Sequence, residues 1–276
     1  MAAGERRTMK DHRQASEFGG VVISIVTYNN EKTITGVLKN ILKFSQGEDV
    51  RIVVYDNHSK DGTVKSVQSL GTAVELVQGQ KNRGYGYGHN RIAERYPKAS
   101  YYLICNPDLY MQDCLVRSFR RYFEKHPQIG LLTPQVFYPT GKRQYLCWKN
   151  PKVIDLFSRY FLRWRRKGWA ARLRRMHEMR GCDYRKSFEV EHATGCCMMV
   201  RGNVFRLIGG FDEGYFLYFE DADITRRINA VSRAVYYPES AVTHLWTRGS
   251  YHSMRLALVA VRSAIRYFHK WGWELW

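Results

Sequence analysis

An alternation of apolar, β-branched runs with amphipathic segments over about the first 135 residues constrains the fold of this chain more than any other feature. Short apolar runs bounded by polar turns predict buried strands, and apolar residues every three to four positions predict helices. The predicted strands cover 21–26, 51–55, 73–77 and 101–105, and the predicted helices cover 31–44, 64–70, 88–95 and 112–124. This alternation predicts an α/β fold, with a doubly wound, mostly parallel sheet and helices on both faces.

The rest of the sequence continues this domain and adds two basic helical segments. After residue 189 the pattern predicts strands at 196–200, 234–237 and 241–246, and helices at 203–208 and 220–231. Residues 1–18 are polar with charges of both signs, which predicts a disordered leader. We predict one domain over 19–250, with a basic helical insertion at 150–185, and then an amphipathic C-terminal helix over 251–276.

The charge balance predicts a polyanionic partner. The chain has 276 residues, with 44 Lys and Arg against 25 Asp and Glu, a formal net charge of +19. Such a balance favours nucleic acid, an anionic membrane or phosphorylated substrates. The segment 158–180 holds nine cations and one acid, with Trp and Phe at near-helical spacing. It predicts either a basic amphipathic helix at a membrane interface or an ordinary helix with a solvated basic face.

The C-terminal segment leaves two similar alternatives. Apolar residues recur there at three and four positions, with cations on the remaining surface, and the chain ends among Trp271, Trp273 and Trp276. Aromatic residues beside cations favour the headgroup level of a membrane. A helix that covers the core is the other interpretation, and one helix could do both.

Cysteine usage and hydropathy indicate the compartment. No two CxxC pairs are present, so a zinc site is not predicted. Cys196 and Cys197 lie in an apolar run and are predicted to be buried small hydrophobes, as in a reducing cytoplasm. Residues 1–20 lack the apolar segment of a signal peptide, and no run of 18 apolar residues predicts a membrane span. We expect a cytoplasmic protein, peripheral at the inner face of the cell membrane.

Polar residues follow three of the predicted strands directly. They are Thr27, Asp56 and the stretch 106–108. Ligands of doubly wound sheets bind beyond the carboxyl ends of the strands, so we expect these side chains to meet at one edge, which we call the rim. A carboxylate such as Asp108 suits a divalent cation that also binds a diphosphate, although it equally suits a helix cap.

A second acidic cluster lies at 212–223, where five acids stand among aromatic residues. Glu220, Asp221 and Asp223 fall at a predicted helix start, where the helix dipole favours negative charge. Carboxylates beside an apolar wall are candidates for a general base, while a cap or a helix-surface position explains Glu220 and Asp223 equally well. His244 ends a predicted strand, and a lone histidine is only a weak indication of a metal ligand.

The glycine-rich run at 82–90 does not match a dinucleotide fingerprint. After Gly84 and Gly86 the third glycine should stand at His89, and the first predicted strand is followed by Thr27 and Tyr28 rather than glycine. We therefore exclude a Rossmann dehydrogenase. The run is predicted to form a flexible, cationic loop that can approach a phosphate or ribose.

Taken together, these segments resemble the family 2 inverting glycosyltransferases, and within them the rhamnosyltransferase-like group. The resemblance spans about residues 20–270 and rests on motifs that are degenerate alone but specific in this order. They are ISIVTYN at 23–29, VYDNHSKDGT at 54–63, the run 82–90, Asn106-Pro107-Asp108, TGCCMMV at 194–200, GFDE at 210–213, FLYFEDADI at 216–224, and His244.

The resemblance implies a GT-A fold and a role for each matching residue. Asp221 corresponds to the general base of the family, and Asp108 with His244 would bind Mg²⁺ or Mn²⁺. The residues assigned to the nucleotide sugar are Thr27, Tyr28, Asn29, Asp56, Asn57, Arg83, Gly84, Asn90, Asn106 and Asp108. The residues assigned to the acceptor are Tyr218, Glu220 and Trp246.

One departure from the family pattern concerns the metal. The usual Asp-x-Asp is Asn106-Pro107-Asp108 here, so one carboxylate replaces two and metal dependence is expected to be weaker. The Asn-Pro-Asp form is frequent in the rhamnosyltransferase-like group, which implies that activity is retained.

The resemblance implies an in-line transfer of a sugar to a hydroxyl of a lipid-linked or cell-surface polysaccharide acceptor. The donor is expected to be dTDP-L-rhamnose, or else a UDP-hexose. Two rival functions remain: a nucleotidyltransferase, which should carry a glycine-rich loop right after the first strand, and a basic nucleic-acid-binding protein. We favour sugar transfer without nucleic acid, because the densest basic block lies apart from the rim; the oligomeric state is not predicted.

Overall fold

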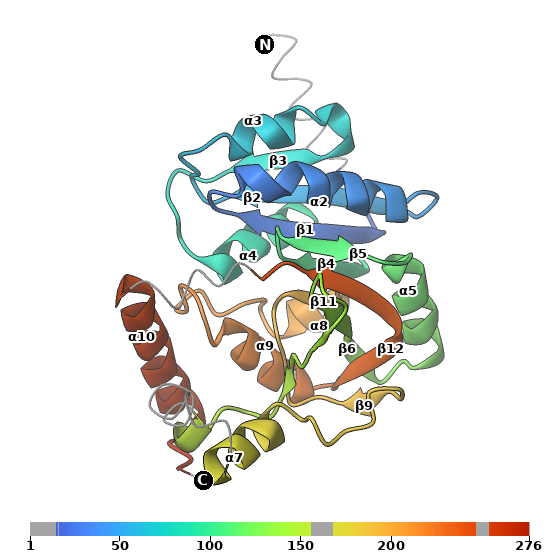
Figure 1. Ribbon diagram of the computed structural model, residues 1–276. Helices are drawn as coiled ribbons and strands as arrows, with labels where there is room; N and C mark the ends of the chain where they lie inside the picture. Colours follow the sequence, from blue (N-terminus) through green and yellow to red (C-terminus); the bar gives the residue numbers. More distant parts are fainter. Residues whose placement is uncertain (1–14, 16, 156–167, 247–253, 276) are drawn as a thin grey trace.

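Figure 1 shows the computed structural model, which describes residue 15 and residues 17–155, 168–246 and 254–275. Its main sheet has the strand order β3-β2-β1-β4-β11-β6-β12-β5. In the same order, these strands are Glu75–Gln78, Val50–Asp56, Val21–Thr27, Tyr101–Cys105, Cys197–Arg201, Ile129–Phe137, Arg233–His244 and Leu109–Met111. Short strands β7 (Arg143–Gln144) and β9 (Phe188–Glu189) flank this path, and β8 (Cys147–Trp148) pairs with β10 (His192–Ala193) in a separate two-stranded sheet.

The sheet is mixed: one half of it is parallel as predicted, and the other half combines both directions, since β6 and β12 also pair in parallel. β1 pairs in parallel with β2 and β4, and β2 pairs in parallel with β3. β11 is antiparallel to both of its neighbours, β4 and β6, and β5 is antiparallel to β12. The predicted parallel arrangement is therefore confirmed for β3, β2, β1 and β4, while the antiparallel pairs of β11 and β5 make the sheet mixed. A short buried apolar run has the same sequence pattern whichever direction its neighbours take.

Helices cover both faces, as predicted. The helices are α2 (Glu31–Phe44), α3 (Thr63–Gln68), α4 (Tyr85–Arg95), α5 (Leu115–Lys125), α7 (Trp169–His177), α8 (Gly202–Leu207), α9 (Glu220–Asn229) and α10 (Met254–Trp271), with a 3₁₀ turn at Gly71–Ala73. Alternate residues of β1 point to opposite faces: Ile23 and Ile25 pack with α2 and α5, while Val22 and Val26 pack with α4, α8 and α9. Both faces of β1 are buried, so its sequence is apolar apart from Ser24 and Thr27.

Several predicted boundaries change. The predictions missed β5 and β6, and the two strands predicted at 234–237 and 241–246 are one strand, β12, with a register shift between Tyr237 and Ala241. α4 begins at Tyr85 rather than at residue 88. Cys196 and Cys197 are buried as predicted, and none of the six cysteines is in a disulfide.

The C-terminal helix α10 stands apart from the sheet and packs on α9 (Figure 1). Its inner face contributes Ala264, Tyr267 and Phe268 to a small apolar cluster with Tyr215 and Ala222. Ion pairs add to this contact. They join Arg266 to Asp212, Lys270 to Asp212 and Lys270 to Asp223. The predicted cap on the core is confirmed for this face.

Parts of three predicted segments lie outside the described residues. These parts are 1–14 and 16 of the leader, 156–167 of the basic insertion, and 251–253 with Trp276 of the C-terminal segment. Of the basic insertion, the described part contains α7 and the loop that follows it. Among the helices that are described, none combines the length and apolar content needed to cross a membrane.

Candidate active site

The first group of polar residues lies where β1 and β2 end. Thr27 and Asp56 are register partners on these parallel strands, and both are buried. The Thr27 hydroxyl donates to Asp56 Oδ1 at 3.1 Å, and the Ser59 hydroxyl donates to the same oxygen at 2.5 Å. The backbone N–H of Ser59 donates to Asp56 Oδ2 at 2.9 Å. The carboxylate is therefore held rigidly at the rim, as a binding site for a polar ligand requires.

Neighbouring loops continue this group. The Asn57 amide donates to the Gly84 carbonyl at 2.9 Å and accepts from the Arg83 N–H at 3.3 Å. Arg83 is exposed and its guanidinium lies 4.4 Å from the centre of the Tyr87 ring. Asn29 accepts from the Lys60 N–H at 2.8 Å, which joins the loop after β1 to the loop after β2. Tyr28 stands beside it, about half exposed.

The glycine-rich run is mostly helix, not the flexible loop that was predicted. Gly86 and Gly88 lie inside α4, where a Cβ would press on Phe211 and on Val26 respectively. These glycines let α4 pack tightly against the sheet and the 210–213 loop. Gly84 has a φ of +100° and lies against the backbone of Phe216. It therefore joins the polar group around Asp56 to the segment that precedes Asp221.

Asp108 and His244 meet because β5 pairs with the end of β12. His244 is the register partner of Leu109, and the Leu245 N–H donates to the Asp108 carbonyl at 3.0 Å. His244 Nε2 then lies 3.2 Å from Asp108 Oδ1 and 3.4 Å from the Asn106 amide nitrogen. Within the described part of the chain, no three His, Cys, Asp or Glu side chains form a metal-binding group. The pair and Asn106 are nevertheless brought together as predicted.

Asp221 lies at the first turn of α9 and is held from three sides. Its carboxylate accepts from the Gly195 N–H at 3.1 Å and from the Ala222 N–H at 2.9 Å, and it lies 3.2 Å from His192 Nε2. Burial alone would raise the pKa of Asp221, but His192 and the two N–H donors outweigh it and hold the pKa below its ordinary value. The group is therefore a carboxylate at neutral pH, able to accept a proton.

The two acids beside Asp221 differ from their predicted roles as cap and surface residue. Glu220 is buried, its Oε2 has no hydrogen-bond partner among the described residues, and it does not cap the helix. Burial, followed by the charge of Asp221, raises the pKa of Glu220 to about 8. Asp223 is fully buried and binds Arg227, Lys270 and the Trp271 indole. Asp223 therefore anchors α10. The capping role predicted for Glu220 and the helix-surface position predicted for Asp223 were both wrong.

The aromatic residues before Asp221 divide into a buried and an accessible set. Tyr215 is fully buried against α10, so it cannot stack on a sugar. Phe216 is 41% exposed, and Tyr218 is partly exposed. Tyr218 and Phe219 have φ of 70° and 66°, a left-handed conformation that non-glycine residues adopt at a cost. Strain of this kind clusters at functional sites.

Trp246 lies beside His244 rather than beside Asp221. Its ring is nearly parallel to that of His244, with 6.5 Å between centroids, and it stacks on Tyr138 at 5.7 Å. It also has a positive φ, 42°. An acceptor role for Trp246 stays a prediction.

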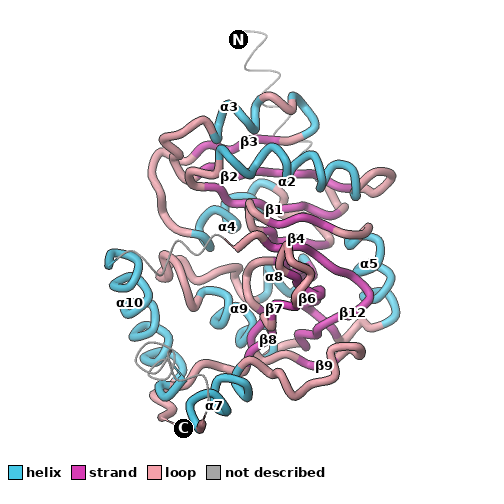
Figure 2. Tube along the Cα trace, viewed as in Figure 1, coloured by secondary structure: helices cyan, strands magenta, loops and turns pink. Residues whose placement is uncertain are grey.

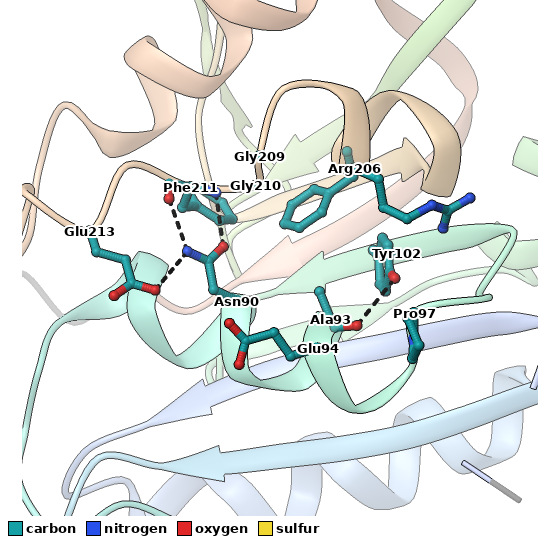
Figure 3. Close-up of a pocket in the computed structure, with 11 residues that line it drawn as sticks. Asn90, Ala93, Glu94, Pro97, Tyr102, Arg206, Gly209, Gly210, Phe211 and Glu213 are labelled. Carbon is teal, nitrogen blue, oxygen red and sulfur yellow. Dashed lines mark hydrogen bonds between the residues drawn. The ribbon is translucent and has the colours of Figure 1, made fainter. Parts of the chain in front are cut away.

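Asn90, one of the residues predicted to bind the nucleotide sugar, lies apart from the other residues with that assignment. Figure 3 shows its amide bonded to both the N–H and the carbonyl of Phe211, and to Glu213. It borders a cavity of about 440 Å³ between α4 and α8, which contains none of the other residues assigned to the nucleotide sugar. Because its amide is hydrogen-bonded to the 210–213 loop, Asn90 holds this loop against α4.

Two adjacent residues join the two groups of the site. The Cys196 carbonyl accepts from the Asn106 N–H at 2.9 Å, and the preceding Gly195 donates to Asp221. Tyr85 holds the same peptide, because its hydroxyl donates to the Gly195 carbonyl at 2.7 Å. The Asn106–Asp108 group and the start of α9 are therefore separated by one dipeptide.

His192 and Gly195 were missed by the sequence analysis. His192 sits on β10, buried, with its ring edge on Trp148 of β8 at 5.2 Å, and Figure 2 shows β8 close to α9. Its partner Asp221 is on a separate element, and no local pattern links the two. Thr194 and Gly195 begin the TGCCMMV motif, and this motif was the signal in the sequence that pointed to Gly195.

The topology and the site define the class of protein first. A mixed sheet, with polar residues at the ends of its parallel strands and an acidic helix beside them, is the GT-A architecture of glycosyltransferases. The fold is similar over 98% of this chain to the mannosyltransferase PcManGT from Pyrobaculum calidifontis, solved with GDP-Man and Mn²⁺, over 72% of that chain. The TM-score is 0.59 and the sequence identity is 17%, so this likeness shows the fold alone.

The sequence comparisons identify the family. The model for glycosyl transferase family 2 matches residues 22–209, and the chain belongs to that family. It is 28% identical over 218 residues to an N-acetylglucosaminyl-diphospho-decaprenol L-rhamnosyltransferase of Mycobacterium tuberculosis, covering 74% of this chain and 69% of the relative. It is 26% identical over 228 residues to the rhamnosyltransferase WbbL of Escherichia coli, covering 79% and 80%. The predicted family and GT-A fold are confirmed.

Proposed function

We propose that this enzyme transfers a sugar from a nucleotide diphosphate donor to an acceptor hydroxyl with inversion at the anomeric carbon. The donor is dTDP-L-rhamnose, or else a UDP-hexose, and the acceptor is a lipid-linked or cell-surface polysaccharide. The observation that carries this proposal is the Gly195-Cys196 dipeptide, which places the Asn106–Asp108 group next to the Asp221 carboxylate. The names of the bacterial relatives support rhamnose as the sugar.

Each residue of the site has one task in this reaction. Thr27, Asp56 and Asn57 bind the nucleoside, and exposed Arg83 faces the diphosphate. Asp221 accepts the proton of the acceptor hydroxyl as its oxygen bonds to the anomeric carbon. The bond from that carbon to the diphosphate oxygen breaks, and the nucleoside diphosphate leaves with the electron pair. A single displacement of this kind inverts the anomeric configuration.

The residues on the metal side fit a divalent cation. Gln144 donates from Nε2 to the carbonyls of Phe137 and His244, so its Oε1 accepts from His244 Nδ1. The tautomer assigned from these bonds has its lone pair on Nε2, which faces Asp108 Oδ1. Two such acceptors repel each other unless a proton or a cation lies between them.

Asp108 and His244 would hold Mg²⁺ or Mn²⁺, with diphosphate oxygens among the remaining ligands. When bound, the cation would neutralise charge on the leaving diphosphate.

A panel of nucleotide sugars tests the proposal. Turnover should be highest with dTDP-L-rhamnose, the product bond should have the configuration opposite to that of the donor by NMR, and a nucleoside diphosphate should be released. Retention of configuration would exclude the single displacement. Release of inorganic diphosphate from a nucleoside triphosphate would instead indicate a nucleotidyltransferase, and a sequence-independent gel shift on DNA or RNA would restore the nucleic-acid alternative.

The outer face of α10 supports a position at the cytoplasmic membrane surface. Met254, Leu258, Val261 and Ile265 are spaced along one face and are 45–86% exposed. Two exposed cations, Arg255 and Arg262, lie on the same helix; basic side chains near an anionic leaflet contribute about 1 kcal/mol each. An apolar stripe beside cations is typical of an interfacial helix.

A flotation assay tests this position. Leu258→Asn with Val261→Asn should release the protein from phosphatidylglycerol liposomes, because both changes remove exposed apolar contacts without touching the core. The control Arg121→Gln with Lys125→Gln, on exposed positions of α5, should stay bound. Unchanged flotation of the α10 variant would refute the membrane role.

A further inference from the structure

An open cavity of about 720 Å³ runs along one face of α7, outside the site described above. Four cations line it, Lys149, Arg172, Arg175 and Arg180, and among the residues that the structure describes no Asp or Glu does. Its volume is within the range of small-molecule sites. The composition of the wall therefore indicates an anionic ligand.

The charges of this cavity are largely uncompensated. Arg180 pairs with Glu178 at 2.5 Å and lies over the Tyr145 ring. For Lys149, Arg172 and Arg175, by contrast, no ion pair is formed within the described residues. Three cations that share one wall repel each other, and a ligand with more than one negative charge relieves that repulsion. Two arginines also suit phosphate oxygens, because each guanidinium can bind them with two N–H groups.

The same wall is apolar in part. Arg172, Arg175 and Met176 follow helical spacing, so two cations and a thioether share one face of α7. Met179, in the turn after the helix, adds a second thioether to the wall. Met176 is 52% exposed, and Trp169, seven positions earlier on the same face, is 51% exposed. Methionine adapts to irregular apolar ligands such as branched hydrocarbon chains. The ligand predicted by this wall is an anion with an apolar tail.

The cavity is connected to the catalytic base through three neighbouring side chains. Lys149 follows Trp148 directly, and the Trp148 ring packs against His192, which lies 3.2 Å from Asp221. β8 and β10 fix this arrangement, since Trp148 and His192 are register partners. Lys149, which lines the cavity, is therefore the sequence neighbour of a residue that packs on the partner of Asp221.

We propose that this cavity binds the diphosphate of a lipid-linked sugar, with the lipid along the methionines and the sugar at Asp221. This inference rests on the proposed function and deepens it, because it assigns the acceptor a binding site of its own. Arg172, Arg175 and Lys149 hold the diphosphate oxygens, and no bond is made or broken there. The ligand is recognised by its diphosphate, which a bulk membrane phospholipid does not have.

Binding of farnesyl diphosphate tests the site directly. Equilibrium dialysis is done in EDTA, so that metal-dependent binding of the diphosphate at the proposed donor site is suppressed. Arg172→Gln with Arg175→Gln should weaken saturable binding at least about 10-fold, the loss expected for two charge-assisted contacts. The α5 control Arg121→Gln with Lys125→Gln, which removes the same charge, should stay within about twofold. Equal weakening in both variants, absent saturable binding, or equally tight binding of farnesol would overturn the proposal.

Kinetics in a neutral detergent separate the acceptor from membrane lipid. The α7 variant should raise KM for a diphosphate-linked lipid sugar at least about 10-fold, and leave KM for a phosphate-free alkyl glycoside of the same sugar unchanged. An unchanged KM for the diphosphate acceptor, with binding to phosphatidylglycerol vesicles lost, would assign the cavity to bulk lipid and overturn the proposal. Failure of every nucleotide sugar would refute the proposed function alone, since farnesyl diphosphate binding is measured without a sugar donor.

Discussion

Thr27 and Asp56 face each other as register partners on two parallel strands, whereas Asp221 is held by a histidine from a two-residue strand and by a loop N–H. The proposed donor side, with Thr27 and Asp56, is thus built by the sheet itself, at the ends of two mostly apolar strands. The proposed acceptor side, around Asp221, is assembled from the short elements β8 and β10 and the start of α9. The helix α10 packs against α9. Rigid strand ends suit the constant part of a substrate, the nucleotide, and assembled loops suit the variable part.

The largest effect should come from Asp221→Asn, which keeps the shape and removes the base. Turnover should fall about 10²- to 10⁴-fold, the usual contribution of a positioned general base, with donor affinity nearly unchanged. Steady-state kinetics and nucleotide-sugar titration measure the two quantities. Glu220→Gln is the matched control and should retain turnover, because a buried group with a raised pKa is protonated at neutral pH. Loss in Glu220→Gln with near-normal Asp221→Asn would move the base to Glu220.

The second effect tests the donor side. Asp108→Ala should weaken metal-dependent binding of the nucleotide sugar at least about 10-fold, because it removes the carboxylate that faces His244. Titration of the donor with and without EDTA measures it. Phe216→Ala is a variant of the acceptor side and should leave donor affinity within about twofold. A wild-type protein whose donor binding ignores EDTA would exclude the metal role of Asp108.

The third effect tests whether His192 positions Asp221. His192→Phe keeps a ring against Trp148 and removes the nitrogen 3.2 Å from the carboxylate. His192 holds the pKa of Asp221 down, so its removal should raise that pKa and shift the acidic limb of the kcat profile to higher pH. We expect about a 10-fold loss of kcat at neutral pH with KM for the donor unchanged. A uniform loss of kcat without a shift of the limb would mean that His192 is only structural.

The same contrast explains what could be predicted from the sequence. Thr27, Asp56 and Asp108 follow strands whose apolar runs are visible in the sequence, so the rim could be located by a general rule for parallel sheets. His192 and the burial of Asp223 could not, because both depend on partners from distant elements. Asn90 was misassigned for a related reason: a conspicuous glycine run suggested a loop, but its glycines serve tight packing of α4. Strand direction in the second half of the sheet likewise has no local signature.

The smallest effect concerns stability rather than turnover, and it isolates the buried acid beside the base. The folded pKa of Glu220, about 8, is above the value of about 4.3 for an unfolded glutamate. Between these pH values the unfolded chain releases the proton and the folded protein keeps it, so stability falls as pH rises. Glu220→Gln removes this loss. Its Tm relative to wild type should therefore increase from pH 5 to pH 8 and level off above, as measured by thermal unfolding. Glu124→Gln, at an exposed position of α5, should give a difference that is flat over the same range. A flat difference for Glu220→Gln as well would mean that Glu220 is ionised in the folded protein, and the acceptor side would then hold two carboxylates able to act as the base.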